Sequence, residues 1–519
     1  MNSNWEQRLG VWAIAQQYPD RLAILDSPST GELTFGELAA RAHRIVHATR
    51  AMGVEAGDTV AIALPNDVDI LVWQLASSEG GWRYYTIGPN LPAGELDEIL
   101  EHSDAKVLVA HASNAENLQK VTRPDVRISV CGEVAGFIAQ PDLVNGHPDS
   151  LPTGRRTGSQ LVYTSGTTGK KKAIEHPLPA IDPDDAADAM KTFGQAFAFE
   201  PLAGVHLVSA GMHHGGCRAF YMGALNIGQS LVIMAKSDPE RVLQLIERFS
   251  VTTAYMVPTQ FVRLLRLPDV TRGRYRVDSL SSVVHSAAPC PLEIKKQMME
   301  WWGPVIWETY GGTEGAATIA KPWRWLEKPG TVGRAIRGMR VHIVDDDGND
   351  LPPNVPGMVY MEPEARGFTY FRDEEQTAQS YRGSSFTIGD IGYLDEDDYL
   401  FIVDRKKDMI ISGGVNVYPA EIEAVLVSHR SVADAAVLGQ PDAEWGERVC
   451  AFVQPAPGVD PGPELAEELV AYVRQHLDSY KCPRQVWFRE QLPRNEAGKL
   501  VKRDLKEVLI DASTKDATR

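Results

Sequence analysis

Short apolar runs alternate with amphipathic segments through the first four hundred residues, and this alternation constrains the fold more than any other feature. Residues 59–65 (TVAIALP) have the length and composition of a buried strand, and residues 68–79 fit a helix. The apolar run 230–235 is followed in the same way by a helical pattern over residues 237–250, with Pro239 suited to its first turn. This β-α-β rhythm predicts parallel sheets covered by helices.

The pattern changes near residue 340 and again near residue 405. Residues 341–352 and 357–363 contain short strand-like runs beside acidic, glycine-containing turns, which predicts antiparallel hairpins. A compact mixture of strands and helices then follows. We therefore expect an α/β protein with a large N-terminal domain, residues 1–404, made of helix-covered sheets and a β-rich subdomain. A small mobile α+β C-terminal domain, residues 405–519, is expected to follow it.

The charge balance and the cysteine pattern exclude several classes of protein. The chain of 519 residues carries 69 acidic and 52 basic side chains, a formal net charge of −17. Such a surface repels nucleic acid and anionic membranes, so we expect neither as a partner. No apolar run approaches the ~20 residues needed to cross a bilayer, and the cysteines have no zinc-binding spacing. The expectation is a cytoplasmic protein without stable membrane insertion.

Residues 163–173 (YTSGTTGKKKA) concentrate hydroxyls, glycines and lysines in one stretch. Hydroxyls and glycine amides donate hydrogen bonds, and lysines add positive charge, so the stretch fits either a solvated turn or a loop around a polyphosphate. It is not a Walker loop, because Thr164 stands where that motif has its first glycine and Lys171 follows Gly169 and Lys170. A phosphate-binding loop here would belong to another class.

Four further motifs follow this loop along the chain: TYGGTEG at 309–315, a run over 386–423 that begins FTIGDIGYL, LDSYKCPRQVWF at 477–488 and LPRNEAGKLVKRDL at 492–505. In this order and spacing the five motifs resemble those of the adenylate-forming superfamily, which comprises acyl-CoA synthetases, non-ribosomal peptide adenylation domains and luciferases. The resemblance covers nearly the whole chain and is strongest to the AMP-forming acid–CoA ligases. It implies an enzyme that uses ATP, Mg²⁺ and coenzyme A, with a small-molecule carboxylic acid as substrate.

The resemblance assigns many of the motif positions to ATP. In the family, Tyr310 would stack on adenine, Thr313 would bond the α-phosphate and Glu314 would ligate Mg²⁺. Asp390 would bind the ribose hydroxyls, with Arg405 assisting. The β- and γ-phosphates would be held by the loop, whose implied contacts are Thr164, Ser165, Gly166, Thr167, Thr168, Gly169 and the motif lysine Lys172.

Other implied positions concern the family's two half-reactions, which are the formation of acyl-AMP and the transfer of its acyl group to a thiol. Lys407 matches the hinge about which the family's C-terminal domain rotates. Gly413 and Gly414 match the region that lines the pantetheine tunnel, where missing side chains leave room for a narrow arm. Lys499 matches the lysine that bridges the carboxylate and the α-phosphate, in the adenylating orientation only. Taken alone, each lysine lies in a charged run that would also fit an ordinary solvated loop.

The acyl pocket is expected around residues 209–225. His214 matches the family's gate position, and Gly215 stands where amino-acid adenylation domains carry an aspartate for the α-ammonium. An unpaired ammonium in a dry pocket is costly, so an amino acid is not the expected substrate. The expected pocket positions are small residues beside the gate: Gly215, Gly216, Ala287, Gly311 and Gly312. They predict a roomy pocket for a bulky or long hydrophobic acid.

Three functions from different classes stay open on the sequence. An acid–CoA ligase is favoured, and an enzyme that loads a carrier-protein thiol or stops at acyl-AMP comes second, since no carrier domain or dedicated insertion is visible. A binding protein that keeps only the fold is least expected, because the charged positions of the family are all present: Lys172, Glu314, Asp390, Arg405 and Lys499. The oligomeric state is open, a homodimer included.

Overall fold

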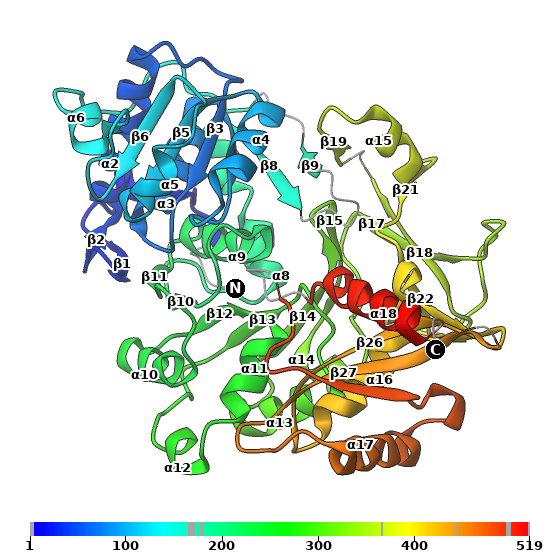
Figure 1. The fold of residues 1–519 in the computed structure, drawn as a ribbon. Helices are drawn as coiled ribbons and strands as arrows, with labels where there is room; N and C mark the ends of the chain where they lie inside the picture. Colours follow the sequence, from blue (N-terminus) through cyan, green and yellow to red (C-terminus); the bar gives the residue numbers. More distant parts are fainter. Residues whose placement is uncertain are drawn as a thin grey trace. The chain divides into compact units, whose positions relative to one another are not determined.

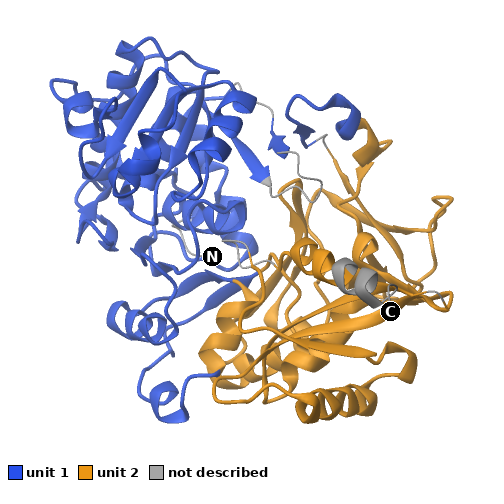
Figure 2. Ribbon diagram, in the orientation of Figure 1, with its two compact units in different colours: residues 1–256, 266–285, 367–377 blue, residues 257–265, 286–366, 378–519 orange. Residues whose placement is uncertain are grey.

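The computed structural model describes residues 5–164, 172–176, 181–364, 367–442, 444–494 and 500–516. The structure is of mixed α/β class, as predicted, with helix-covered sheets in the large N-terminal part and a smaller C-terminal domain. The chain divides into two compact units, coloured separately in Figure 2: Met1–Met256, Arg266–His285 and Gly367–Thr377 in the first, and Val257–Leu265, Ser286–Arg366 and Ala378–Arg519 in the second. The predicted domain boundary at residue 404 lies within the second unit and stays a prediction.

An eight-stranded sheet belongs to the first unit, with the strand order β19-β9-β8-β4-β3-β5-β6-β7. Strands β3 to β8 pair in parallel, whereas β9 and β19 are antiparallel additions at one edge. All residues of β3 are buried, which explains why its sequence is continuously apolar. The bounds are β3 (Thr59–Ala63), β4 (Arg83–Thr86), β5 (Ala105–His111), β6 (Val126–Val130), β7 (Ile138–Ala139), β8 (Ser159–Thr164), β9 (Lys172–Glu175) and β19 (Thr369–Tyr370).

The other strands of the first unit follow the order β13-β12-β10-β11-β1-β2, and all pairs except β1 with β2 are parallel. Their bounds are β1 (Leu22–Asp26), β2 (Leu33–Thr34), β10 (Val205–Val208), β11 (Ser230–Ile233), β12 (Thr253–Met256) and β13 (Ser282–His285). The predicted helix after residue 237 is α10 (Pro239–Phe249), and the Asp238 carboxylate caps it by accepting the Arg241 N–H at 2.7 Å. The β-α-β expectation is therefore confirmed.

Helices accompany these strands in the first unit (Figure 1). Among those described are α1 (Val11–Gln17), α2 (Phe35–Ala51), α3 (Val68–Gly80), α4 (Ala93–Ser103), α5 (Ala115–Leu118), α6 (Gln140–Val144), α7 (Pro183–Asp188), α8 (Lys191–Ala196), α9 (Gly215–Asn226) and α12 (Asp269–Arg272). Nearly every residue of α3 is buried, so this helix has no solvent-exposed face. Within the described residues, no helix combines the length and apolar character needed to cross a membrane.

The β-rich part of the second unit is antiparallel, in the order β20-β21-β18-β22-β23 with β17 beside β18. The predicted hairpin is present as β17 with β18, and β22 pairs with β23 in the same antiparallel manner. The strand bounds are β14 (Ile306–Gly312), β15 (Gly315–Ala320), β16 (Arg334–Ala335), β17 (Met339–Val344), β18 (Gly357–Pro363), β20 (Tyr381–Arg382), β21 (Ser385–Phe386), β22 (Asp390–Leu394) and β23 (Leu400–Arg405). The neighbouring helices are α11 (Pro258–Leu265), α13 (Leu292–Trp302), α14 (Pro322–Glu327) and α15 (Glu374–Ser380).

The C-terminal part forms its own sheet, in the order β25-β24-β27-β26 with β28 beside β27. Val437 and Ala451 face one apolar cluster, whereas Leu438 and Phe452 face another, as expected for side chains that alternate along a strand. The elements, yellow to red in Figure 1, are β24 (Ile410–Ser412), β25 (Val415–Val417), α16 (Pro419–Ser428), β26 (Val432–Asp442), β27 (Gly446–Pro455), α17 (Pro463–His476), β28 (Gln485–Phe488) and α18 (Lys502–Asp516).

Candidate active site

Three residues predicted to contact ATP form one cluster in the second unit. Asp390 begins β22 and lies directly opposite Arg405, the last residue of β23. The Tyr310 hydroxyl, from β14, donates a hydrogen bond to Asp390 Oδ2 at 2.9 Å, and Arg405 Nε lies 3.4 Å from Asp390 Oδ1. The fold thus gathers residues from two sequence motifs around a single carboxylate that is 5% exposed.

Burial and the neighbouring carboxylate keep Tyr310 protonated. Burial is the larger cause, and Asp390 adds to it, so that the pKa of the Tyr310 phenol lies well above its usual value. The phenol therefore remains a hydrogen-bond donor across the physiological range. This arrangement leaves the aromatic ring as a flat apolar surface beside a carboxylate that can accept hydroxyl hydrogen bonds.

The glycines of the TYGGTEG motif build a tight hairpin between β14 and β15. Gly311 has a φ of 157°, and a side chain there would overlap the backbone of Gly315 and Ala316. The Thr313 hydroxyl lies 3.2 Å from Glu314 Oε2, and the space beside the Gly312 Cα is filled by that same carboxylate. Both glycines thus have a local packing reason, while their predicted place in the acyl pocket stays a prediction.

Glu314 has the chemistry of a magnesium ligand. Mg²⁺ in nucleotide enzymes is commonly bound by one or two carboxylates together with phosphate oxygens and water. No set of three or more histidine, cysteine or acidic side chains suited to a metal ion is found among the described residues. Glu314 offers one such carboxylate beside the Thr313 hydroxyl, and its role as a magnesium ligand stays a prediction.

A hydrogen-bonded loop precedes His214 in the first unit. The Asn66 amide donates to the carbonyls of Ala210 and Met234 at 2.8 and 3.0 Å, and its oxygen accepts the Met212 N–H at 2.7 Å. The Thr86 hydroxyl donates to the His213 carbonyl at 2.9 Å. Sequence reasoning missed both polar residues, although each lies at or just after the carboxyl end of a parallel strand, where a polar side chain is a recognisable signal.

His214 and the two glycines after it mark the start of α9. His214 is the residue before the first turn of the helix, and its ring centroid lies 4.0 Å from that of His213. A side chain on Gly216 would come within 2.6 Å of the Tyr255 hydroxyl on β12. The glycine thus allows α9 to lie close to β12, a reason that was not visible in the sequence.

The structure describes only the two ends of the predicted phosphate loop. Thr164 ends β8 and pairs with Lys172, which begins β9, so the two ends of the loop are neighbours in an antiparallel ladder. The predicted contacts Ser165, Gly166, Thr167, Thr168 and Gly169 lie outside the described residues, as does Lys499.

Ala287, another predicted pocket residue, has a φ of 74°. A left-handed conformation is unfavourable for a residue with a Cβ, and strain of this kind is concentrated at functional sites. The loop that follows β13 is therefore held in a shape that its own sequence does not favour, and the place of Ala287 in the acyl pocket stays a prediction.

The predicted thiol channel has an aromatic neighbour. Gly413, with a φ of 58°, and Gly414 form the turn between β24 and β25. A Cβ on Gly413 would lie 2.9 Å from the Trp445 ring, and the guanidinium of Arg484 lies 5.7 Å from that ring's centroid. Trp445 is 45% exposed, so part of its indole faces solvent beside this turn. The hinge candidate Lys407 is exposed within the short helix η3 (Lys406–Asp408).

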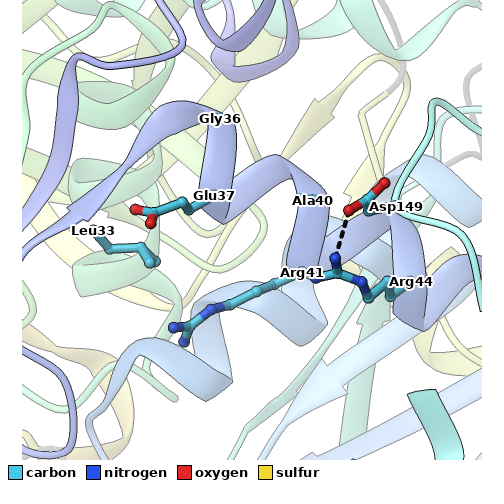
Figure 3. Close-up of a pocket in the computed structure, with 7 residues that line it drawn as sticks. All are labelled: Leu33, Gly36, Glu37, Ala40, Arg41, Arg44 and Asp149. Carbon is cyan, nitrogen blue, oxygen red and sulfur yellow. Dashed lines mark hydrogen bonds and ion pairs between the residues drawn. The ribbon is translucent and has the colours of Figure 1, made fainter. Parts of the chain in front are cut away.

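A separate hollow of about 420 Å³ lies on helix α2 (Figure 3). Its lining consists of Leu33, Gly36, Glu37, Ala40, Arg41, Arg44 and Asp149, and it includes none of the predicted site residues. Arg44 and Asp149 form an ion pair within the hollow, so these two charged side chains of its lining neutralise each other. The hollow gives no support to an acyl or nucleotide site at this place.

Comparison with known proteins agrees with these motifs. A family model described as AMP-binding enzyme matches residues 11–365, and a model described as AMP-binding enzyme C-terminal domain matches residues 421–499. A 2-succinylbenzoate–CoA ligase of Bacillus licheniformis is 30% identical over 95% of this chain and 98% of its own length. A fatty acid–[acyl-carrier-protein] ligase of Streptomyces coeruleorubidus is 30% identical over 95% of this chain and 94% of its own.

A solved structure gives the same result at the level of the fold. The o-succinylbenzoate CoA synthetase of Bacillus subtilis, in complex with its acyl-adenylate intermediate, superposes with a TM-score of 0.80 at 26% identity. The match covers 97% of this chain and 98% of that one.

Proposed function

Because the chain belongs to the AMP-binding enzyme family, we propose that it activates a carboxylic acid with ATP and transfers the acyl group to the thiol of coenzyme A. The observation that carries this proposal is the cluster of Tyr310, Asp390 and Arg405, which offers an aromatic face and a carboxylate side by side. This combination suits a nucleoside, whose base can stack and whose ribose hydroxyls can donate hydrogen bonds. The cytoplasm, where ATP and coenzyme A are available, is the proposed site of the reaction.

The first half-reaction forms a mixed anhydride. A carboxylate oxygen of the acid attacks the α-phosphorus of ATP, the bond from that phosphorus to the bridging oxygen breaks, and pyrophosphate leaves with the electron pair. Two anions must approach each other, which costs ~1 kcal/mol per pair of unit charges at 4 Å in water and more in a poorly screened site. Cationic and hydrogen-bonding groups placed around the developing charge lower this barrier.

The residues of this chain supply such groups in the proposed mechanism. Lys172 would act on the phosphates, the Thr313 hydroxyl on the α-phosphate, and Lys499 between the acid and the α-phosphate. Glu314 would hold Mg²⁺, which supplies positive charge beside the phosphates when it is bound. Thr313 and Glu314 are adjacent in one tight turn, so both can act on the same region of the nucleotide.

In the second half-reaction the thiolate of coenzyme A attacks the acyl carbonyl, the carbon–oxygen bond to AMP breaks, and AMP leaves. The proton of the thiol passes to solvent or to the leaving phosphate. We propose that the C-terminal domain rotates about Lys407 between the two steps. The turn at Gly413 and Gly414 would then admit the pantetheine arm, beside the exposed face of Trp445.

The proposed acid is bulky or long and mainly hydrophobic. Gly215 offers no carboxylate to an α-ammonium, and an unpaired ammonium in an apolar pocket costs a few kcal/mol. The similar proteins named above are named for 2-succinylbenzoate, an aromatic acid, and for fatty acids, and neither of these is an amino acid. These two features support an aromatic or aliphatic acid over an amino acid.

A carrier protein is the alternative acceptor. The similar ligase of Streptomyces coeruleorubidus is named for an acyl-carrier protein, and its thiol is chemically the same as that of coenzyme A. The first half-reaction would be unchanged, and only the molecule that carries the pantetheine arm would differ.

A pyrophosphate-release screen tests the proposal. Benzoate, cinnamate, 2-succinylbenzoate, octanoate and palmitate would be compared with free amino acids, each with ATP and Mg²⁺, with and without coenzyme A. We expect a hydrophobic acid to release pyrophosphate and to give its CoA thioester. Failure of every acid, or an amino acid as the best substrate, would contradict the proposal.

Asp390→Asn should raise the KM for ATP about tenfold or more, because hydrogen bonds to a charged group contribute ~1.5–3 kcal/mol.

A further inference from the structure

Arg494 forms a two-pronged ion pair at one end of the segment 495–499. Its Nε lies 2.6 Å from Asp434 Oδ2, and its Nη2 lies 2.6 Å from Asp434 Oδ1. The two side chains are only 25% and 18% exposed. Asp434 belongs to β26, so this contact ties the end of the segment to the long β26–β27 hairpin of the C-terminal sheet. A paired fork of this kind fixes the orientation of both groups, not only their separation.

Lys502 forms a second ion pair at the other end. Its Nζ lies 2.7 Å from Glu423 Oε1, and the two side chains are 16% and 21% exposed. The same Glu423 oxygen accepts the Val437 N–H at 2.7 Å, so the carboxylate is held by β26 as well. Burial alone would lower the pKa of Lys502, but Glu423 raises it on balance, and the lysine stays charged. Lys502 is the first residue of α18, so the pair fixes the start of that helix to α16.

The chain just before the segment also pairs with the chain just after it. Arg494 and Leu500 form an antiparallel bridge, and the Val501 N–H donates to the Pro493 carbonyl at 2.8 Å. Leu492 and Leu505 pack in one apolar cluster with Leu438 and Phe452 of the sheet. The two flanks therefore share a fixed base, and each flank carries its own ion pair.

We propose that the Arg494–Asp434 and Lys502–Glu423 pairs are positioning contacts for Lys499 in the adenylation step. The inference rests on the proposed function, in which Lys499 acts between two anions. A lysine side chain is long and freely rotating, so its placement depends on how firmly the backbone beneath it is held. A displacement of ~1 Å of a group that acts on the transition state can lower a rate about 100-fold. Neither pair touches the reacting atoms; both act through Lys499.

Lys502 also interacts electrostatically with Asp404 and Asp408, which lie on either side of the hinge candidate Lys407. The Asp404 carboxylate in turn accepts the Ala420 N–H of α16 at 2.9 Å. The charged groups that act on Lys502 besides Glu423 therefore flank the hinge candidate, and one of them, Asp404, is hydrogen-bonded to the first turn of α16. This placement fits a contact that matters in one orientation of the small domain.

The experiment compares variants of the full-length protein in the two half-reactions. Glu423→Gln combined with Lys502→Met removes one pair without leaving a charge unpaired, and Asp434→Asn weakens the other. Lys502→Arg keeps the charge and should recover much of the activity. The matched control is Lys481→Met, because Lys481 forms a pair of similar length, 2.8 Å, with Glu421 on the same helix α16, and neither residue belongs to the flanks of the segment.

Adenylation would be followed by ATP–pyrophosphate exchange with the best acid of the panel, and thioester formation by supplying that acid's synthetic acyl-AMP with coenzyme A. We expect the two pair variants to lose about 10- to 100-fold in exchange while their thioester rates and that of Lys481→Met stay near the parent values. Equal losses in both steps, an equal loss in Lys481→Met, or no loss at all would overturn the inference.

Amide hydrogen exchange of the two described flanks, residues 492–494 and 500–505, gives a readout that does not depend on turnover. The pair variants should exchange faster there than the parent and Lys481→Met, and equal protection would overturn the inference. If the parent activates no acid while this difference is present, the proposed function fails and the positioning contacts stand as features of the C-terminal domain.

Discussion

The absence of a side chain at Gly312 leaves the space that the Glu314 carboxylate occupies. The Glu314 carboxylate occupies the space that a Cβ at Gly312 would take, and it lies 3.2 Å from the Thr313 hydroxyl. The sequence, through its resemblance, predicted a magnesium ligand at Glu314 and a pocket residue at Gly312. It could not predict that the two compete for one volume, because that depends on how the turn folds back.

Gly312→Ala is expected to displace Glu314 from this position. The new methyl group would overlap Glu314 Oε2, and the flexible carboxylate is the group that must move. We expect a loss of about 10- to 100-fold in adenylation, measured by pyrophosphate exchange, with little change in the unfolding temperature. Gly462→Ala is the control, since no atom lies within 4 Å of its added Cβ. Retention of the parent rate in Gly312→Ala would contradict the assignment.

At the scale of elements, the sequence predicted individual strands and helices better than it predicted the contacts between them. The apolar run of β3 and the cap and proline of α10 determine those elements by short-range effects, and both are present. The packing of Gly216 against Tyr255 and the pairing of Arg494 with Asp434 join residues that lie far apart in the chain. No periodicity records such partners, so the basic run around Lys499 could equally be interpreted as a solvated loop.

His206 on β10 is expected to make the fold sensitive to acid. The Thr253 hydroxyl donates to Gln229, so His206 Nδ1 must be the donor in its own 2.9 Å bond to Thr253, and burial lowers the pKa of His206 to about 3. The unfolded chain binds a proton near pH 6.5 and the folded chain does not. The free energy of unfolding should therefore fall as the pH drops, by about 1.4 kcal/mol per pH unit between ~6 and ~3.

Urea unfolding followed by tryptophan fluorescence at several pH values would measure this slope. His206→Asn should reduce the pH slope of the unfolding free energy by the contribution of one bound proton, about 1.4 kcal/mol per pH unit. This change in slope is expected whatever the substitution does to stability at neutral pH. Parallel slopes for the variant and the parent would show that His206 is not the group responsible.

At the scale of the whole molecule, the proposal requires the small domain to serve two steps in turn. Lys499→Ala should slow acyl-AMP synthesis by about 10²–10³, as expected for loss of a placed donor in the transition state, and should leave thioester formation from supplied acyl-AMP nearly unchanged. Lys407→Pro should do the reverse, because proline fixes φ near −65° and removes a backbone donor at the proposed hinge. Equal impairment of both steps in both variants would contradict domain rotation.

The most direct measurement follows the oxygen of the acid. If the carboxylate attacks the α-phosphorus and AMP later leaves with that oxygen, an acid labelled with ¹⁸O in its carboxyl group must place one labelled oxygen in the AMP product. Mass spectrometry of the AMP formed with ATP, Mg²⁺, coenzyme A and the best acid of the panel would detect it. The account predicts AMP carrying one ¹⁸O together with the CoA thioester; unlabelled AMP, or ADP as the nucleotide product, would contradict it.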